Sequence, residues 1–401
     1  MGWPSDRYMA LEIRLLSFST GQPHPLVEQP IVFIATKSLF LGHCSAVIEI
    51  VGDFLALLVT FPEAQYEGED MFFLVRWKKG EAHLMSLPTL RDTPWASESE
   101  APSFFAFLSQ DILVFANPIQ NMLQVAKIVI DNGNTPSLVP LCVFNLPPLA
   151  RRASTDHIEC RGEPNPTGPG HSAIPAPDRP FHDKAEDAII MFTLFALDSH
   201  IGRCQFAFIV HRSALLAHIP AAYRECAPFC SPPELTPATA LVQVPWSAWG
   251  PAATRWFEGH LLALNWITTT AGQRSVTFKG GNTTPIIVRD FNPYSVRASR
   301  VLATASGKSL QGSWSTQLPN GNSVSLKIED TVIAAGSMFK EDVRSSLPYV
   351  EIVTETEYEY DGVLIDEERI LGLKVCLGCF NMSLTSEFGE FGCTELSFFT
   401  V

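Results

Sequence analysis

The stretch of the sequence that is richest in recognition chemistry runs from Pro245 to Glu258. Within eleven residues it holds three tryptophans and one arginine, which are Trp246, Trp249, Arg255 and Trp256. Trp and Arg are over-represented at the energetic centres of protein interfaces, because they bury a large area and keep a polar group available. We therefore take these four residues as the candidate binding site. The alternative interpretation is that the same aromatic side chains pack between neighbouring sheets of the core.

A second chemical pattern is formed by Cys376-x-x-Cys379 together with Cys393, which has the spacing of part of a metal site. A structural zinc ion needs four ligands, and no histidine follows residue 260. The fourth ligand would have to come from a distant strand. The sequence therefore favours buried thiols at these positions, and we predict neither a metal site nor a cofactor.

Sequence motifs of catalytic or nucleotide-binding sites are absent. The chain contains no G-x-S-x-G, H-E-x-x-H or G-x-G-x-x-G pattern. Gly307-Lys308-Ser309 resembles the end of a phosphate-binding loop, but Leu302 stands where that loop requires a glycine. We therefore predict that the protein is not an enzyme. An enzyme whose catalytic side chains converge at the central channel of a propeller is kept as a third hypothesis.

The charge balance bears on the class of partner. The chain has 28 basic and 42 acidic side chains, so its formal net charge is −14. A surface this acidic repels phosphate backbones, and we expect no binding to nucleic acid. The longest uncharged apolar run, 188–197, is shorter than the roughly 20 residues that span a membrane. Because the first residues also lack the pattern of an export signal, we expect a cytoplasmic or nuclear protein with no membrane contact.

The elements that position the candidate site are expected to be β-strands. Runs rich in β-branched and aromatic residues recur along the chain and are bounded by Gly, Pro and charged residues. The expected strands group into five units: 45–51, 53–60, 71–77 and 82–87; 104–108, 111–116, 122–130 and 138–144; 188–197 and 204–211; 260–266, 275–279, 286–291 and 295–298; 331–335, 349–360 and 363–365.

The spacing of these units suggests one repeat-built domain over residues 1–401. The second strands begin near 53, 111, 189, 260 and 331, so the spacings are 58, 78, 71 and 71 residues. Propeller repeats span about 40–50 residues, so long irregular loops must account for the excess. One such loop is the proline-rich segment 160–187, which we expect to be mobile. We predict an all-β protein, a β-propeller of about six four-stranded blades.

The sixth blade is expected to be shared between the two ends of the chain. Residues 9–18 have the pattern of an outer strand, with no inner strands before them. Pairing of this strand with strands at 369–375 and 394–401 would close the ring and remove the free edges. Residues 376–401 otherwise form an atypical C-terminal segment.

Four stretches of the sequence carry a family resemblance. They are STGQPHP at 19–25, VPWSAWGP at 244–251 with TRWF at 254–257, VRSSLPY at 343–349, and YDGVLIDEERILGLK at 360–374. With these stretches, residues 9–375 resemble the propeller-like C-terminal region of the F-box proteins of basidiomycete fungi. The resemblance implies a substrate receptor of an SCF-type ubiquitin ligase, in which the propeller holds the target protein.

The chain departs from this family at its N-terminus. An F-box is a helical module of about 45 residues that binds the ligase adaptor, and residues 1–50 have the pattern of strands instead. We therefore expect adaptor binding only if an F-box is encoded upstream. The alternative hypothesis is a free-standing scaffold propeller with no link to a ligase. In both cases the partner is a protein whose identity the sequence does not give.

Overall fold

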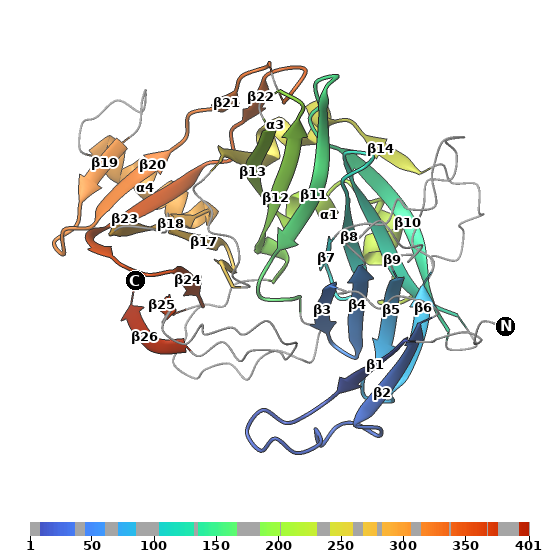
Figure 1. The fold of residues 1–401 in the computed structure, drawn as a ribbon. Coiled ribbons are helices and arrows are strands. Elements are labelled where there is room, and N and C mark those ends of the chain that lie inside the picture. Colours follow the sequence, from blue (N-terminus) through green and yellow to red (C-terminus); the bar gives the residue numbers. More distant parts are fainter. Residues whose placement is uncertain are drawn as a thin grey trace.

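The computed structural model (Figure 1) confirms the all-β class. It describes residues 9–36, 45–60, 71–85, 104–131, 135–166, 185–200, 202–230, 241–259, 268–278, 283–305, 314–336, 338–366, 368–375 and 393–400. The described strands form several sheets, which are antiparallel except for one parallel pair. Most of the proline-rich segment 160–187, the expected strand 260–266 and the Gly307-Lys308-Ser309 stretch lie outside the described residues.

The first two expected units are confirmed as complete sheets. The first contains β3 (Ser45–Val51), β4 (Phe54–Thr60), β5 (Met71–Arg76) and β6 (Glu81–Met85). The second contains β7 (Phe104–Phe107), β8 (Ile112–Asn117), β9 (Met122–Ile130) and β10 (Pro136–Asn145), with β14 (Val242–Val244) added in parallel to β10. Within each sheet, β3 to β6 and β7 to β10 pair with their neighbours along the chain, so the pattern of β-rich runs identifies them.

The third sheet is larger than the sequence suggested. Its order is β11 (Ala153–Arg161), β12 (Ile189–Asp198), β13 (Gly202–His211) and β15 (Thr254–Glu258). Short helices follow β13 and precede β15: α1 (Arg212–Leu216), α2 (Ala221–Glu225) and α3 (Trp246–Ala253), and a 3-10 turn, η1 (Ala185–Asp187), precedes β12. The candidate residues therefore lie on α3 and β15, beside the third sheet and at its edge.

Strands from the fourth and fifth expected units share one six-stranded sheet, which is a correction, and the other described strands of the fifth unit lie in separate sheets. Its order is β16 (Thr270–Ala271), β17 (Arg274–Phe278), β18 (Thr284–Asp290), β23 (Tyr349–Tyr358), β20 (Ser323–Lys327) and β19 (Trp314–Gln317). The long alternating strand β23 pairs with β18 on one side and β20 on the other. The expected strand at 295–298 is also wrong, because these residues lie in a helix, α4 (Pro293–Ala305). The side chain of Asn292 accepts the Tyr294 backbone N–H at 2.8 Å, and Pro293 begins the helix.

The expected pairing of the two ends of the chain is not formed. The N-terminal strand β1 (Met9–Arg14) pairs with β2 (Ile31–Thr36) as a two-stranded hairpin. At the other end, β25 (Arg369–Val375) pairs with β24 (Gly362–Ile365) and β26 (Cys393–Thr400). A further hairpin is formed by β21 (Thr331–Ile333) and β22 (Val343–Ser345). Each terminal strand therefore finds its partner nearby in the sequence instead of at the opposite end.

Successive sheets pack against one another along the first two thirds of the chain. Figure 1 shows β3, β7 and β11, the first strands of three sheets, side by side. A core of phenylalanines joins the first two sheets: Phe72 packs edge-on against Phe105 and Phe115, each at 5.1 Å between ring centres. Burial of aromatic side chains between sheets fixes how the sheets stack, and it positions the site described below.

Candidate binding site between two sheets

The four residues predicted from the sequence come together in the structure, but as part of the core. Trp246 and Trp249 lie on α3, and Arg255 and Trp256 lie on β15. The exposed fractions of Trp256 and Trp249 are 0% and 3%, Arg255 is also buried, and Trp246 is partly buried. The alternative interpretation, in which these aromatics pack between sheets, is the arrangement that the structure shows.

The contacts of the tryptophans explain why they are buried. Trp256 stacks on Phe208 of β13 with 4.8 Å between ring centres, and Trp249 packs edge-on against Phe144 of β10 at 5.2 Å. The indole N–H of Trp249 donates to the backbone carbonyl of Asn145 at 2.9 Å. The cluster therefore joins the second sheet to the third, and the buried indole keeps a hydrogen-bond partner.

Arg255 ties the third sheet to the segment that connects β20 and β23 of the six-stranded sheet. Its guanidinium donates to the backbone carbonyls of Leu347 and Glu329, each at 2.7 Å, and to the Thr331 hydroxyl at 2.7 Å. It also lies over the ring of Tyr349, 5.3 Å from its centre. Burial lowers the pKa of this guanidinium, and the nearby acidic groups oppose that effect. These bonds engage the side chain inside the protein, so it is not presented to a partner.

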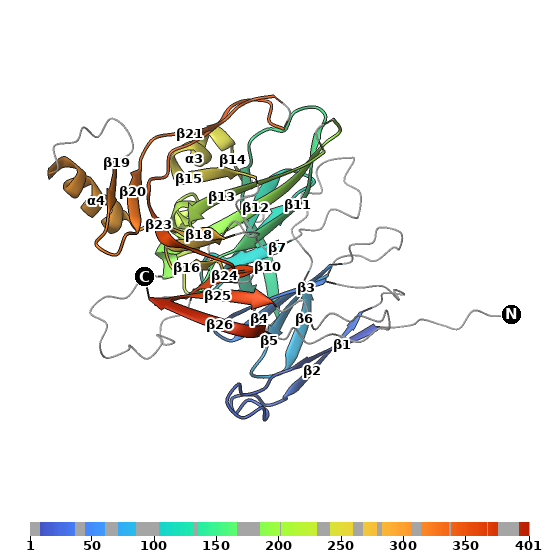
Figure 2. The same ribbon diagram turned by 60° about the vertical axis from the view of Figure 1, so that its left-hand side comes forward.

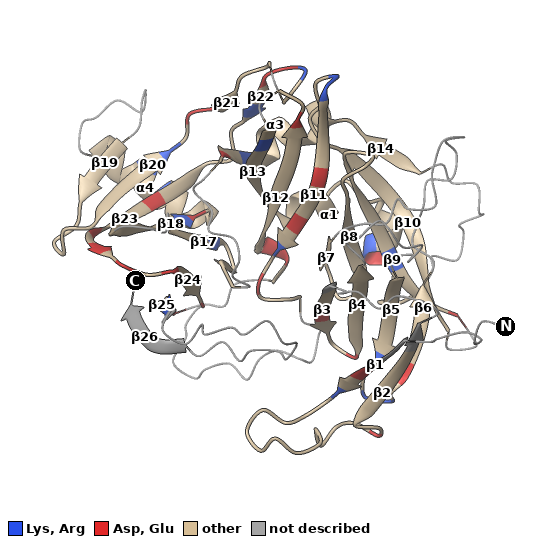
Figure 3. Ribbon diagram, in the orientation of Figure 1, with Lys and Arg blue, Asp and Glu red and all other residues tan. Residues whose placement is uncertain are grey.

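A recess of about 730 Å³ lies between the second sheet and the short helices of the third, and it is our candidate binding site. One wall comes from the turn between β7 and β8, from the start of β8 and from β9. It carries Ser109, Asp111, Ile112 and Lys127. Figure 3 shows that charged residues are sparse along β8, β9 and β10, so a lysine within this apolar sheet is exceptional.

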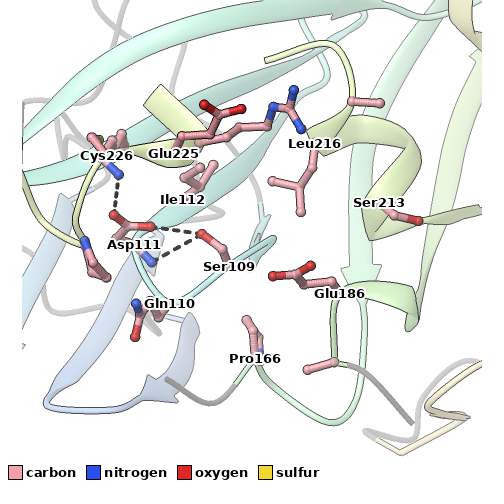
Figure 4. A pocket seen from close by; sticks show the side chains of 15 residues that line it. Ser109, Gln110, Asp111, Ile112, Pro166, Glu186, Ser213, Leu216, Glu225 and Cys226 are labelled. Atoms are coloured by element: carbon pink, nitrogen blue, oxygen red, sulfur yellow. Dashed lines mark hydrogen bonds and ion pairs between the residues drawn. The ribbon is translucent and has the colours of Figure 1, made fainter. Parts of the chain in front are cut away.

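This first wall is fixed by a buried ion pair. Lys127 and Asp111 are both buried and form a salt bridge. The same carboxylate accepts the Ser109 hydroxyl at 2.9 Å, as Figure 4 shows. It also accepts the backbone N–H of Phe229 at 2.9 Å, and Lys127 donates to the Tyr223 carbonyl at 3.3 Å. Buried charges need such partners, because an isolated one costs several kcal/mol. The ion pair therefore holds the segment around α2 against the second sheet.

The second wall is formed by Pro166, η1 and α1, and it is fixed by Arg212. This arginine is fully buried and donates to the backbone carbonyls of Pro164 at 2.7 Å and Ala185 at 3.0 Å, and also to that of Gly162. Three carbonyls on two separate segments are thus held by one planar guanidinium, which is suited to several simultaneous hydrogen bonds. Both walls are therefore anchored by a buried cation.

Arg212 of the second wall belongs to a group of charged side chains that interact with one another, together with Glu49, Arg161 and Glu163. Burial and the neighbouring Glu49 of β3 raise the pKa of Glu163 to about 7, while Arg212 and Arg161 oppose the rise. The pKa of Glu49 is raised by burial, and a hydrogen bond from Asn165 opposes this. Burial lowers the pKa of Arg212 to about 10, so its guanidinium stays charged at neutral pH. Glu163 is thus the group whose charge changes near neutral pH.

The lining of the recess offers both hydrogen-bonding and apolar surfaces. Figure 4 shows the Leu216 side chain and the Glu186 carboxylate directed into the hollow, with the Ser109 hydroxyl facing them. Glu225 and Arg224 stand at the rim formed by α2. Apolar contact area combined with a few polar groups is the usual composition of a ligand pocket. The recess can therefore accept a side chain or a short segment of another molecule.

Sequence reasoning did not single out these pocket residues. A signal for Lys127 was present, since it is the one charged residue in the run MLQVAKIVI of β9. Cys376 and Cys379 of the predicted cysteine pattern lie outside the described residues. Within the described ranges, no group of three or more His, Cys, Asp or Glu side chains is arranged to hold a metal ion.

Comparison with known proteins gives no significant match among family models, curated proteins or solved structures. In the part of the chain that the structure describes, no helix has the length and apolar character needed to cross a membrane.

Proposed function

We propose that this protein is a receptor that holds another protein, and that a segment of that target enters the recess between the second and third sheets. The observation that carries the proposal is the construction of the recess. Its two walls come from different sheets, and each is anchored by a buried cation, Lys127 or Arg212, bonded to the backbone behind it. A site whose shape is fixed before binding loses little conformational entropy when a ligand enters.

The link to a ubiquitin ligase in this proposal rests on the family resemblance. In that interpretation the sheets are blades of a propeller-like domain of about six blades, and the domain is the target-binding part of an SCF-type substrate receptor. The in-order packing of the first three sheets supports a blade-like arrangement. The proposed receptor reaches the ligase adaptor only if an F-box is encoded upstream, and a free-standing scaffold is the alternative.

The resemblance stretches support a shared fold more directly than a shared target. Two of them, 244–257 and 343–349, pack against each other. The Ser346 backbone N–H donates to the Pro251 carbonyl at 2.8 Å, and the Ser345 hydroxyl accepts the Trp256 backbone N–H at 2.9 Å. These residues form a junction inside the fold, so the target has to be sought at the recess.

The proposal is tested by filling the recess without disturbing the core. Ser213 is exposed on α1 and lines the recess, so Ser213→Trp places a large ring in the hollow. Ser323→Trp, on the exposed side of β20 in another sheet, is the matched control. Proteins captured by the tagged wild-type chain from a cell extract are identified by mass spectrometry. We expect the specific partners to be retained by the control and lost with Ser213→Trp, and equal capture by both variants would refute the site.

The ligase link is tested separately with the purified adaptor. The 401-residue chain should not bind the adaptor, whereas the same chain extended by its upstream coding sequence should bind it if an F-box is present there. Stable binding by the 401-residue chain alone would contradict this part of the proposal and leave the recess experiment unaffected.

A further inference from the structure

Helix α4 is the longest helix among the described residues, and only one of its faces is covered. Val296, Ser299 and Ala303 are buried where the helix packs on β20 and β23. Figure 2 shows α4 at the outer end of the six-stranded sheet, beside β19 and β20 and away from the first two sheets. The rest of its circumference is therefore free of contact with those sheets.

The opposite face of α4 carries an apolar stripe. The exposed fractions of Tyr294, Val301 and Leu302 are 77%, 64% and 59%. With 3.6 residues per turn, these side chains share a face with Ala298 and Ala305. Surface helices normally turn polar residues to solvent, so a second apolar stripe indicates an interaction surface.

The charges beside this stripe are all of one sign. Arg297 and Arg300 are exposed along one edge of it, and α4 contains no acidic residue. Neither arginine forms an ion pair with the described part of the chain. A purely basic helix is unusual in a chain with a formal net charge of −14. The surface therefore complements an acidic partner.

We propose that the outer face of α4 docks an amphipathic helix of a partner protein whose flanks are acidic. The apolar face of that helix would cover Tyr294, Val301 and Leu302, and its carboxylates would pair with Arg297 and Arg300. Helix-on-helix docking of this kind uses anchors that recur every three or four residues, and the stripe follows this rule with Tyr294, Ala298, Val301, Leu302 and Ala305. An anionic membrane is disfavoured as the occupant. Stable attachment of a protein to anionic lipids needs more cations than the two arginines, and such lipids repel a chain with an acidic net charge.

The experiment uses the full chain and a defined probe. The probe is a designed fluorescent 14-residue helical peptide with leucines on one face and glutamates on the flanks, and a second peptide has lysines in place of the glutamates. Binding is measured by fluorescence anisotropy. We compare the wild type with Leu302→Glu and with the matched control Leu84→Glu, an exposed leucine of β6 whose exposed fraction is 62%.

We expect the acidic peptide to bind the wild type and the Leu84→Glu variant, and to bind Leu302→Glu about tenfold more weakly or worse. The double variant Arg297→Glu, Arg300→Glu should prefer the lysine peptide. The proposal is overturned if the acidic peptide does not bind, or if both peptides bind the wild type equally. It is also overturned if Leu302→Glu abolishes binding to phosphatidylserine vesicles, or abolishes dimers of the chain seen by sedimentation, because the occupant is then a membrane or a second copy.

Discussion

Replacing Glu163 by glutamine should make the stability of the protein less dependent on pH. Burial and the nearby Glu49 raise the pKa of Glu163 from 4.5 to about 7. A carboxyl group with a raised pKa binds its proton more tightly in the folded state. Its contribution to stability is therefore complete below the unfolded-state pKa and is lost as the pH rises towards the folded-state pKa. The wild type should thus lose stability between about pH 4.5 and 7.

The size of the effect follows from the same pKa. A rise of about 2.5 corresponds to about 3.4 kcal/mol for a fully sequestered group, since each pKa unit is worth about 1.4 kcal/mol. Glu163 is partly exposed, and screening by solvent reduces the expected loss to about 1.5 kcal/mol. Glutamine has a similar shape and never ionises. Glu163→Gln should therefore match the wild type near pH 5 and exceed it by about 1.5 kcal/mol near pH 8.

The assay is urea unfolding of both proteins between pH 5 and 8, followed by tryptophan fluorescence. Glu357→Gln is the matched control, because the same substitution is made at an exposed position of β23. The control should follow the wild type at every pH. If the free energies of unfolding of Glu163→Gln and the wild type differ by the same amount at every pH, the reasoning is refuted. Ionisation of Glu163 would then not lower the stability of the fold.

Three further substitutions test the packing that supports the site. Trp256→Ala should lower the free energy of unfolding by about 3–5 kcal/mol, because it removes a fully buried ring; a stable variant that only loses its partner would show that the ring acts in binding. Asp111→Ala should lower the free energy of unfolding, measured by chemical denaturation, by about 3–5 kcal/mol, because it leaves Lys127 buried without its carboxylate partner. A loss below about 1 kcal/mol would contradict the buried ion pair. Gly250→Ala should lower the free energy of unfolding by about 1–3 kcal/mol in the same assay, because an added Cβ would lie 2.0 Å from the Trp246 ring. An unchanged free energy of unfolding would mean that the ring is free to move.

The first two sheets were predictable because their information is local. β3 to β10 are runs rich in β-branched and aromatic residues, and within each of the two sheets every one of these strands pairs with the next along the chain. The six-stranded sheet was not predictable by the same argument. β23 pairs with β20 across the β21–β22 hairpin, and with β18 across α4 and four further strands. A strand pattern does not specify such distant partners.

The error at 295–298 has a specific cause. Four residues, SVRA, are too few to distinguish a strand from a helix by periodicity. The decisive signal lay just before them, where Asn292 caps the backbone and Pro293 takes the first helical position. A search for helix starts would have found α4 from the sequence.

The sequence by itself determined the all-β class, because short-range alternation of residue types is a local property of the chain. Its composition also marked Trp246, Trp249, Arg255 and Trp256 as an exceptional group. Only the tertiary structure decided what that group does. Trp256 is buried because β13 and the segment near Phe339 meet over it, and both contacts join residues far apart in sequence. The same holds for the recess, whose two walls are each anchored by long-range bonds, those of Lys127 and of Arg212. Residue type limits what a side chain can do, and its neighbours in space determine whether it packs the core or meets a partner.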